Sequence, residues 1–334
     1  MNTILDAAGL TPVVKLRKVA PAGVEVLCKV EFFGPSGSVK DRILPHIVSR
    51  AIERGELREG MTIIEGTTGN TGIATSMVGA ALGFPVTIVM PEGMSEERKK
   101  TIVAYGAKLV LTPGAESDVD LVLEKVAELK AEEAGRYYQV GQFTNQDNVE
   151  AHYRATGPEL WEQLGGKVDA FVASQGTGGT ITGIGRYLKE QNPAVKIFAV
   201  EPSECPILSG GDWGSHRIEG IGDGFVPEVL DLNVLDGVIQ VSSDEAIEMA
   251  RRLAREEGIF CGISSGCNVA ASVKLFNHGG RFGRIATVLN DNGLRYLSTE
   301  LCGGPVVLDT LERDHESDHE LSERLRRAAL EVIA

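Results

Sequence analysis

The sequence predicts an α/β protein whose parallel sheets are covered by helices on both faces. Short runs of β-branched and other apolar residues alternate with longer segments that have the apolar spacing of amphipathic helices. This alternation is typical of βαβ units, in which the strands are buried on both faces. A chain of 334 residues, 43% of them hydrophobic, is long enough for one large domain or two modest domains.

The predicted elements follow one another along most of the chain. We expect buried strands at 24–32, 62–65, 86–90, 108–112, 170–174, 197–201 and 285–289. We expect helices at 41–54, 70–82, 95–105, 119–134, 152–164, 179–191, 243–257 and 268–276. The charged segment 306–334 has helical spacing, and we interpret it as a solvated surface helix without a functional role.

Composition excludes several classes of protein. The formal net charge of −14 argues against a nucleic-acid-binding protein, which would carry a basic field. The five cysteines are scattered, without a C-x-x-C pair or zinc spacing, so we expect a cytoplasmic protein without a metal. The N-terminus does not resemble a signal peptide, and no apolar stretch is long enough to span a membrane.

Lys40 follows a predicted strand and a bend that contains Gly34, Pro35 and Gly37, and it falls in the first turn of the next helix. The positive end of the helix dipole disfavours a second positive charge, so the pKa of this ammonium is expected to be lowered. A lysine with a lowered pKa is a usable amine nucleophile, of the kind that forms a Schiff base with an aldehyde. For an isolated lysine, the simpler interpretation would be an ammonium group that lies in water.

Three further strand-to-helix turns carry polar or glycine-rich sequences. The turn after residue 65 places hydroxyls, an amide and backbone N–H groups at a helix N-terminus, which is either an anion site or an ordinary helix cap. The turn at 174–180 could bind a phosphate or, with Glu201 on the next strand, a dinucleotide, although its glycines run G-x-G-G. At 262–266, Ser264 and Ser265 are expected to cap a helix.

Together these motifs resemble the cysteine synthase and cystathionine beta-synthase family of pyridoxal-phosphate enzymes. The matching sequences are K-x-E-x-x-x-P-S-x-S-V-K-x-R ending at Arg42, T-T-G-N-T from Thr67, Q-F-x-N-x-x-N from Gln142, G-T-G-G-T from Gly176, G-I-G-x-G-F from Gly220 and G-I-S-S-G from Gly262. They occur in the family's order and cover about residues 11–301.

The resemblance implies a role for each matching residue. Lys40 would hold pyridoxal phosphate and act as the general base, Asn70 would bond the ring hydroxyl, and Ser264 would face the pyridine nitrogen. The phosphate would be bound by Gly176, Thr177, Gly178, Gly179 and Thr180, and the substrate by Thr67, Thr68, Gly69, Thr71, Gln142 and Gly222. Thr68 stands where the family usually has Ser, Gly66 where Pro is common, and Asp223 where a small residue is common.

The resemblance also implies an architecture of two α/β domains facing each other across a cleft. On this basis we expect an N-terminal domain at 40–148, a larger domain formed by 1–39 with 149–305, and a homodimer. The first strand segment is expected to belong to the larger domain.

The implied activity is the reaction of an O-activated serine, O-acetyl-L-serine first of all, with sulfide to give cysteine and acetate. Alternatives are a cystathionine beta-synthase-like enzyme using serine and homocysteine, a nicotinamide-dependent dehydrogenase, and a silent partner-binding member of the fold. Glu219 and Asp223 argue against a phosphoserine-using variant, because both would oppose a phosphate. A complex with serine acetyltransferase is left open.

Overall fold

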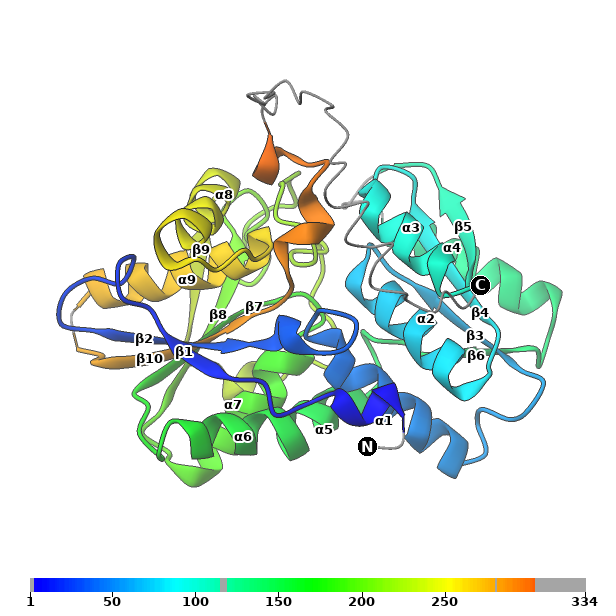
Figure 1. Ribbon diagram of the computed structural model, residues 1–334, viewed down its shortest axis with the longest axis horizontal. Helices are drawn as coiled ribbons and strands as arrows, with labels where there is room; N and C mark the ends of the chain where they lie inside the picture. Colours follow the sequence, from blue (N-terminus) through cyan, green and yellow to red (C-terminus); the bar gives the residue numbers. More distant parts are fainter. Residues whose placement is uncertain (1–2, 115–118, 280, 304–334) are drawn as a thin grey trace, which may run out of the picture. The chain divides into compact units, whose positions relative to one another are not determined.

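A computed structural model describes residues 3–114, 119–279 and 281–303, which belong to one compact unit (Figure 1). Ten strands form two sheets within these residues. The predicted helix in segment 306–334 lies outside the described residues. Among the described helices, none combines the length and the apolar character needed to cross a membrane.

The larger sheet has six strands in the order β1-β2-β10-β7-β8-β9. Its strands are β1 (Val13–Lys15), β2 (Glu25–Val30), β7 (Ala170–Ser174), β8 (Lys196–Pro202), β9 (Gly237–Val241) and β10 (Arg284–Leu289). Only the pairing of β1 with β2 is antiparallel. The N-terminal strands therefore share a sheet with the second half of the chain.

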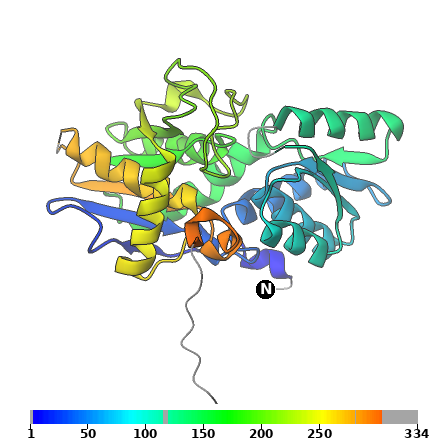
Figure 2. The same cartoon turned by 90° about the horizontal axis from the view of Figure 1, so that it is seen from above.

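The smaller sheet has four parallel strands in the order β5-β4-β3-β6. They are β3 (Thr62–Gly66), β4 (Val86–Pro91), β5 (Lys108–Thr112) and β6 (Tyr137–Gln139). In Figures 1 and 2 the elements of this sheet, coloured from light blue through cyan to green, lie beside those of the larger sheet. The division into domains at residues 40 and 148 stays a prediction.

Helices cover both faces of each sheet. They are α1 (Lys40–Glu53), α2 (Asn70–Leu82), α3 (Glu96–Ala104), α4 (Val119–Glu132), α5 (Asp147–Ala151), α6 (Gly157–Gln163), α7 (Gly179–Gln191), α8 (Ser243–Arg252) and α9 (Ile263–Asn277). Apolar side chains of α8 and α9 form a core on one face of the larger sheet, and those of α6 and α7 on the other. Likewise α1, α2 and α3 cover one face of the smaller sheet and α4 the other.

The predicted α/β class is thus confirmed, with differences in individual elements. Strands β1, β6 and β9 were not predicted; β1 and β6 are three residues long, and β9 is an edge strand whose residues are mostly part-exposed. The predicted helix 152–164 consists of a π-helical turn at His152–Thr156 followed by α6, and α5 directly precedes it. Helix α9 begins at Ile263, five residues earlier than predicted.

Candidate active site

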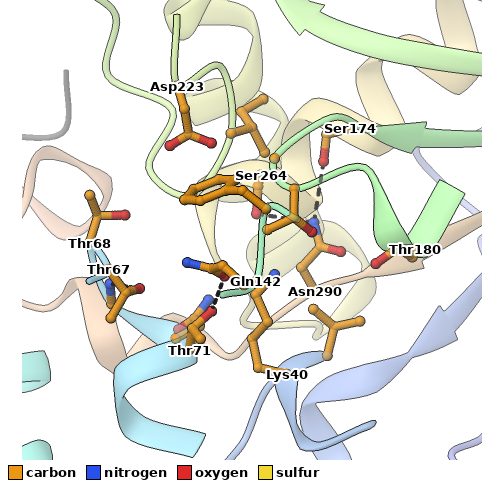
Figure 3. Close-up of a pocket in the computed structure, with 18 of the residues that line it drawn as sticks. Lys40, Thr67, Thr68, Thr71, Gln142, Ser174, Thr180, Asp223, Ser264 and Asn290 are labelled. Carbon is orange, nitrogen blue, oxygen red and sulfur yellow. Dashed lines mark hydrogen bonds between the residues drawn. The ribbon is translucent and has the colours of Figure 1, made fainter. Parts of the chain in front are cut away.

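A pocket lies where loops after strands of both sheets meet. Its lining residues follow β3, β6, β7 and β10 and include the first residue of α1. Ligands of parallel sheets bind at this edge, beyond the carboxyl ends of the strands. Figure 3 shows Lys40 and Gln142 pointing into one space, with Thr67 and Thr68 on one side of it and Thr180 on the other.

Most of the predicted site residues line this pocket. They are Lys40, Thr67, Thr68, Gly69, Asn70, Thr71, Gln142, Gly176, Thr177, Gly178, Thr180 and Ser264. Gly179 and Gly222 lie behind the lining. A Cβ on Gly179 would approach Asn148, and one on Gly222 would approach Pro202 and His216.

Lys40 begins helix α1, and a tight loop fixes its position. The Asp41 carboxylate accepts hydrogen bonds from the backbone N–H groups of Ser36 (2.9 Å) and Gly37 (3.1 Å). Gly37 has a φ of 84°, and a Cβ there would lie 2.6 Å from an atom of Asn292. Glycine is needed because it alone tolerates both the left-handed backbone and the close approach.

The pKa of the Lys40 ammonium is lowered from its usual value, as the sequence predicts, but mainly for another reason. The largest cause is loss of hydration in the pocket, and the carboxylates of Asp223 and Asp291 oppose it by raising the pKa. Desolvation disfavours the charged form of an amine. Lys40 therefore has the electrostatic setting of a reactive amine, with two acidic groups near it.

The other charged residues of the Lys40 motif have a structural role. Arg42 bonds Glu31 (2.7 Å) and Glu159 (2.6 Å), and Lys29 lies 3.0 Å from Glu159. Lys29, Glu31 and Arg42 are buried. The network joins β2, α1 and α6 beneath the pocket, so these charges hold the start of α1 in place.

Helix α2 begins at Asn70 without a side-chain cap, which leaves the backbone donors of its first turn directed at the pocket. The Gly69 N–H donates to Thr67 Oγ1 (3.1 Å), and Thr71 Oγ1 donates to Gln142 Oε1 (2.5 Å). This loop and Gln142 therefore form one polar wall made by β3, α2 and the segment after β6.

Asn70 connects the two sheets. Its amide nitrogen donates to Asp291 Oδ2 (2.7 Å), and its carbonyl oxygen accepts from Arg295. Asp291 also accepts from the Tyr296 hydroxyl (2.8 Å). Since Asp291 follows β10 of the larger sheet, the start of α2 is fixed to the opposite side of the pocket.

Gly66 is buried at the end of β3. A Cβ there would lie 2.8 Å from the side chain of Val122 on α4. The residue that departs from the family's usual Pro is therefore part of a close helix-to-sheet contact.

The turn from β7 to α7 needs its glycines for packing. A Cβ would lie 2.5 Å from the backbone oxygen of Gly220 if placed on Gly176, and 2.1 Å from Asn148 Oδ1 if placed on Gly179. Gly178, at the N-cap, has a φ of 86° and provides no side-chain cap. The first turn of α7 therefore presents uncapped backbone N–H groups, an arrangement that favours anions.

The hydroxyls of the two threonines of this turn contact side chains of α5 and of the π-helical turn that follows α5. Asn148 donates to Thr177 Oγ1 (3.0 Å), and Thr180 Oγ1 lies 3.2 Å from His152 Nε2. The pKa of His152 is well below its usual value because the ring is buried, with Arg42 and Lys40 adding to the effect. The ring is therefore neutral at pH 7.

The prediction that Ser264 and Ser265 cap a helix is wrong. Both lie inside α9, whose N-cap is Gly262. Their hydroxyls instead accept hydrogen bonds from Asn290, Ser264 from the side-chain amide (3.1 Å) and Ser265 from the backbone N–H (2.9 Å). A Cβ on Gly262 would lie 2.1 Å from Asp291 Oδ1, so this N-cap position requires a glycine.

Sequence reasoning missed several residues of the site. Asn290 and Arg98 line the pocket, while Asp291 and Asn148 support it from behind. Asn290 and Asp291 directly follow a predicted buried strand, a position that could have marked them. Arg98 lies in a helix with other charged residues, and nothing in the sequence distinguishes it.

One group of described residues has metal-ligand chemistry. Ligand atoms of His46, Asp147 and Glu150 lie within 4.8 Å of one another. Asp147 is paired with Arg54 and Glu150 with Arg154. None of the three lines the pocket, and the arginines already neutralise the carboxylates.

Comparison with known proteins agrees with this geometry. Residues 4–291 match the family model described as pyridoxal-phosphate dependent enzyme. A cysteine synthase of Staphylococcus aureus is 46% identical over 303 residues, 90% of this chain and 97% of that protein. The crystal structure of an O-ureido-L-serine synthase is similar with a TM-score of 0.87 and 41% identity, covering 92% of this chain and 98% of that one. A cysteine synthase from Entamoeba histolytica has a TM-score of 0.86 and 39% identity, with 93% of each chain covered.

Proposed function

Because the chain belongs to the family of pyridoxal-phosphate dependent enzymes, we propose that it is a cysteine synthase. The reaction is the replacement of the acetyl ester of O-acetyl-L-serine by sulfide, which gives L-cysteine and acetate. The observation that carries the proposal is that Lys40 lies in one pocket with two uncapped helix N-termini, those of α2 and α7. The 46% identity to a cysteine synthase over most of both chains supports the choice of substrates.

The residues of the pocket fit the cofactor. The first turn of α7 offers backbone N–H groups and the hydroxyls of Thr177 and Thr180 to a phosphate. Gly176 and Gly178 let this turn pack closely, because a Cβ would lie 2.5 Å from the Gly220 backbone oxygen or 2.7 Å from Leu230 Cβ. Lys40 supplies the amine for covalent attachment, and Asn70 supplies a side-chain amide that Asp291 and Arg295 hold in place.

Ser264 is proposed to face the pyridine nitrogen. Its hydroxyl accepts a hydrogen bond from Asn290, which fixes its orientation. A neutral hydroxyl does not enforce protonation of the ring nitrogen, whereas a carboxylate would. This environment favours loss of a β-substituent over transamination.

When bound, pyridoxal phosphate withdraws electrons from Cα of the attached amino acid, so that the α-proton becomes acidic and the β-substituent can leave. Lys40 is proposed to take that proton and to return it to Cα after sulfide has added. The lowered pKa of its amine suits this exchange, since a general base works best with a pKa near the working pH.

The carboxylate of the substrate is proposed to bind at the start of α2. Thr67, Thr68, Gly69 and Thr71 supply hydroxyl and backbone donors, and Gln142 adds an amide. An uncapped helix N-terminus favours a carboxylate in the same way that it favours a phosphate. Gly222 supports the opposite wall, where its backbone oxygen lies 3.0 Å from His216 Nε2.

A panel of assays on the purified protein tests the proposal. O-Acetyl-L-serine, O-phospho-L-serine and L-serine are each combined with sulfide and with homocysteine. We expect the highest kcat/KM for O-acetyl-L-serine with sulfide. Higher values with homocysteine would indicate the cystathionine beta-synthase-like alternative, and no turnover of any pair would overturn the proposal.

Three finer expectations stay proposals. They are the homodimer, the cytoplasmic location and the complex with serine acetyltransferase. Light scattering with and without an added serine acetyltransferase tests the two assemblies on the same preparation.

A further inference from the structure

A buried ion pair closes one side of the pocket. Arg98 on α3 pairs with Glu219, in the segment between β8 and β9. The Arg98 side chain is 2% exposed and that of Glu219 is 17% exposed. Because α3 packs on the smaller sheet and Glu219 belongs to a loop of the larger sheet, the pair joins the two walls.

The guanidinium of Arg98 is held directly behind the loop proposed to bind the substrate carboxylate. A Cβ on Gly69 would lie 2.5 Å from Arg98 Cδ and Nε. The guanidinium also lies over the Tyr296 ring, 4.7 Å from its centroid. These contacts leave Arg98 little freedom, so its charge stays beside the pocket.

The charges around the pocket depend on this pair. The charged residues that line it in the described chain are Lys40, Arg98 and Asp223. Glu219 directly precedes the lining residue Gly220 and neutralises Arg98. With the pair intact, Arg98 offers no net positive charge to an anionic leaving group, and Lys40 is the remaining cation.

We propose that Glu219 is a specificity-determining residue that disfavours O-phospho-L-serine and thereby favours the uncharged acetyl ester. This inference rests on the proposed function and assigns the choice of leaving group to one side chain. A phosphate ester carries about two negative charges at pH 7. Without Glu219, the same pocket would hold an unpaired arginine, which binds phosphate well.

The first experiment compares kcat/KM for O-phospho-L-serine and O-acetyl-L-serine at a fixed sulfide concentration. Glu219→Gln should raise the ratio of the two values by at least about tenfold, since a unit charge acts strongly on a dianion across a partly desolvated pocket. The gain should shrink as salt is added. Inorganic phosphate should also become a stronger competitive inhibitor against O-acetyl-L-serine. Glu96→Gln removes one exposed negative charge from the same helix as Arg98 and should leave the ratio unchanged.

Two further variants keep the test decisive. The double change Arg98→Gln with Glu219→Gln leaves no unpaired charge and should restore the native ratio. Arg98→Gln alone leaves Glu219 unpaired and should lower the ratio, and it serves if Glu219→Gln does not fold. An unchanged ratio in all three variants would overturn the assignment. If the native protein used neither ester, the proposed function would have failed instead.

Discussion

At the scale of single residues, Lys40 shows how position decides reactivity. The Asp41 carboxylate orders the preceding loop, and loss of hydration lowers the pKa of the amine. Asp223 and Asp291 act against that shift, so the pKa of Lys40 depends on both acids. A motif in the sequence can identify this lysine, but it cannot reveal that burial is the largest cause of its lowered pKa.

The first prediction concerns the covalent link. The protein should be yellow, and borohydride should remove the colour and fix the cofactor on Lys40, as mass spectrometry of peptides would show. Lys40→Ala should lower kcat by a factor of roughly 10²–10⁴ or more, the usual contribution of a general base. Lys196→Ala, at an exposed position, is the control. A label on another lysine would show that the assignment is wrong.

Glu65 is a second residue whose behaviour follows from its surroundings. Burial raises the pKa of its carboxyl to about 7, although the N–H groups of Gly141 and Gln142 lower it in part. Between about pH 4.5 and 7 the folded protein therefore holds a proton that the unfolded chain releases. Stability contributed by this group is present below that range and is lost as the pH rises through it.

The second prediction uses this linkage. The free energy of unfolding should be measured in urea for the native protein and for Glu65→Gln at several pH values. The advantage of the native protein should fall between about pH 4.5 and 7, by up to about 3 kcal/mol. An advantage that grows with pH would mean that Glu65 is ionised in the folded state at low pH.

At the scale of elements, the turn from β7 to α7 requires glycines because neighbouring segments pack closely against it. A side chain on Gly179 would clash with Asn148, and Asn148 donates a hydrogen bond to Thr177. A glycine-rich turn in the sequence predicts that another group packs closely against the backbone, but it does not say whether that group is a ligand or the protein. In the structure, Gly176, Gly178 and Gly179 are packed closely against other residues of the protein.

The third prediction is that Gly179→Ala weakens cofactor binding without unfolding the protein. The new methyl group would displace Asn148 and with it the hydroxyl of Thr177, so the affinity should fall by at least about tenfold, the equivalent of one charge-assisted hydrogen bond. Titration of the cofactor-free protein, followed by absorbance, measures it. Gly279→Ala has no neighbour within 4 Å and should have no effect. Equal affinities would mean that Asn148 does not position the turn.

Long, strongly periodic elements could be predicted from the sequence, and short or interrupted ones could not. Helices α2 and α7 begin and end where the apolar spacing predicts. Strand β6 is too short to show a period, and α9 begins in a polar stretch, G-I-S-S-G, that resembles a cap. There the competing signal was the local preference of serine for helix caps.

At the scale of the whole described unit, side chains from helices beside the smaller sheet are bonded to side chains from loops that follow strands of the larger sheet. Asn70 bonds Asp291, and Arg98 pairs with Glu219. Such contacts join residues more than a hundred positions apart, so spacing along the chain cannot predict them. The hydrogen bond from Thr71 to Gln142, in contrast, joins two residues that both follow strands of the smaller sheet.

The fourth prediction is that replacing Gln142 and replacing Asn70 have different effects, because only Asn70 joins the two sides of the pocket. Gln142→Ala removes a donor from the proposed carboxylate site, so KM for O-acetyl-L-serine should rise about 10- to 100-fold while the cofactor stays bound. Asn70→Ala removes a group that joins the two sheets beside Lys40, so the absorption spectrum of the cofactor should change as well as the rate.

The two variants also test how the walls of the pocket move. If substrate binding draws the α2 loop toward the larger sheet, water is excluded from the reacting carbon and side reactions are suppressed. Gln142→Ala removes a group that is proposed to bind the substrate carboxylate, so the walls should close less on substrate binding. More of the amino-acid substrate should then be lost as pyruvate and ammonia instead of being converted to cysteine. In Asn70→Ala the link between the sheets is lost before substrate binds, and the spectrum should change without substrate. Release of the cofactor by Gln142→Ala, or an unchanged spectrum and rate in Asn70→Ala, would show that the two roles are assigned to the wrong residues.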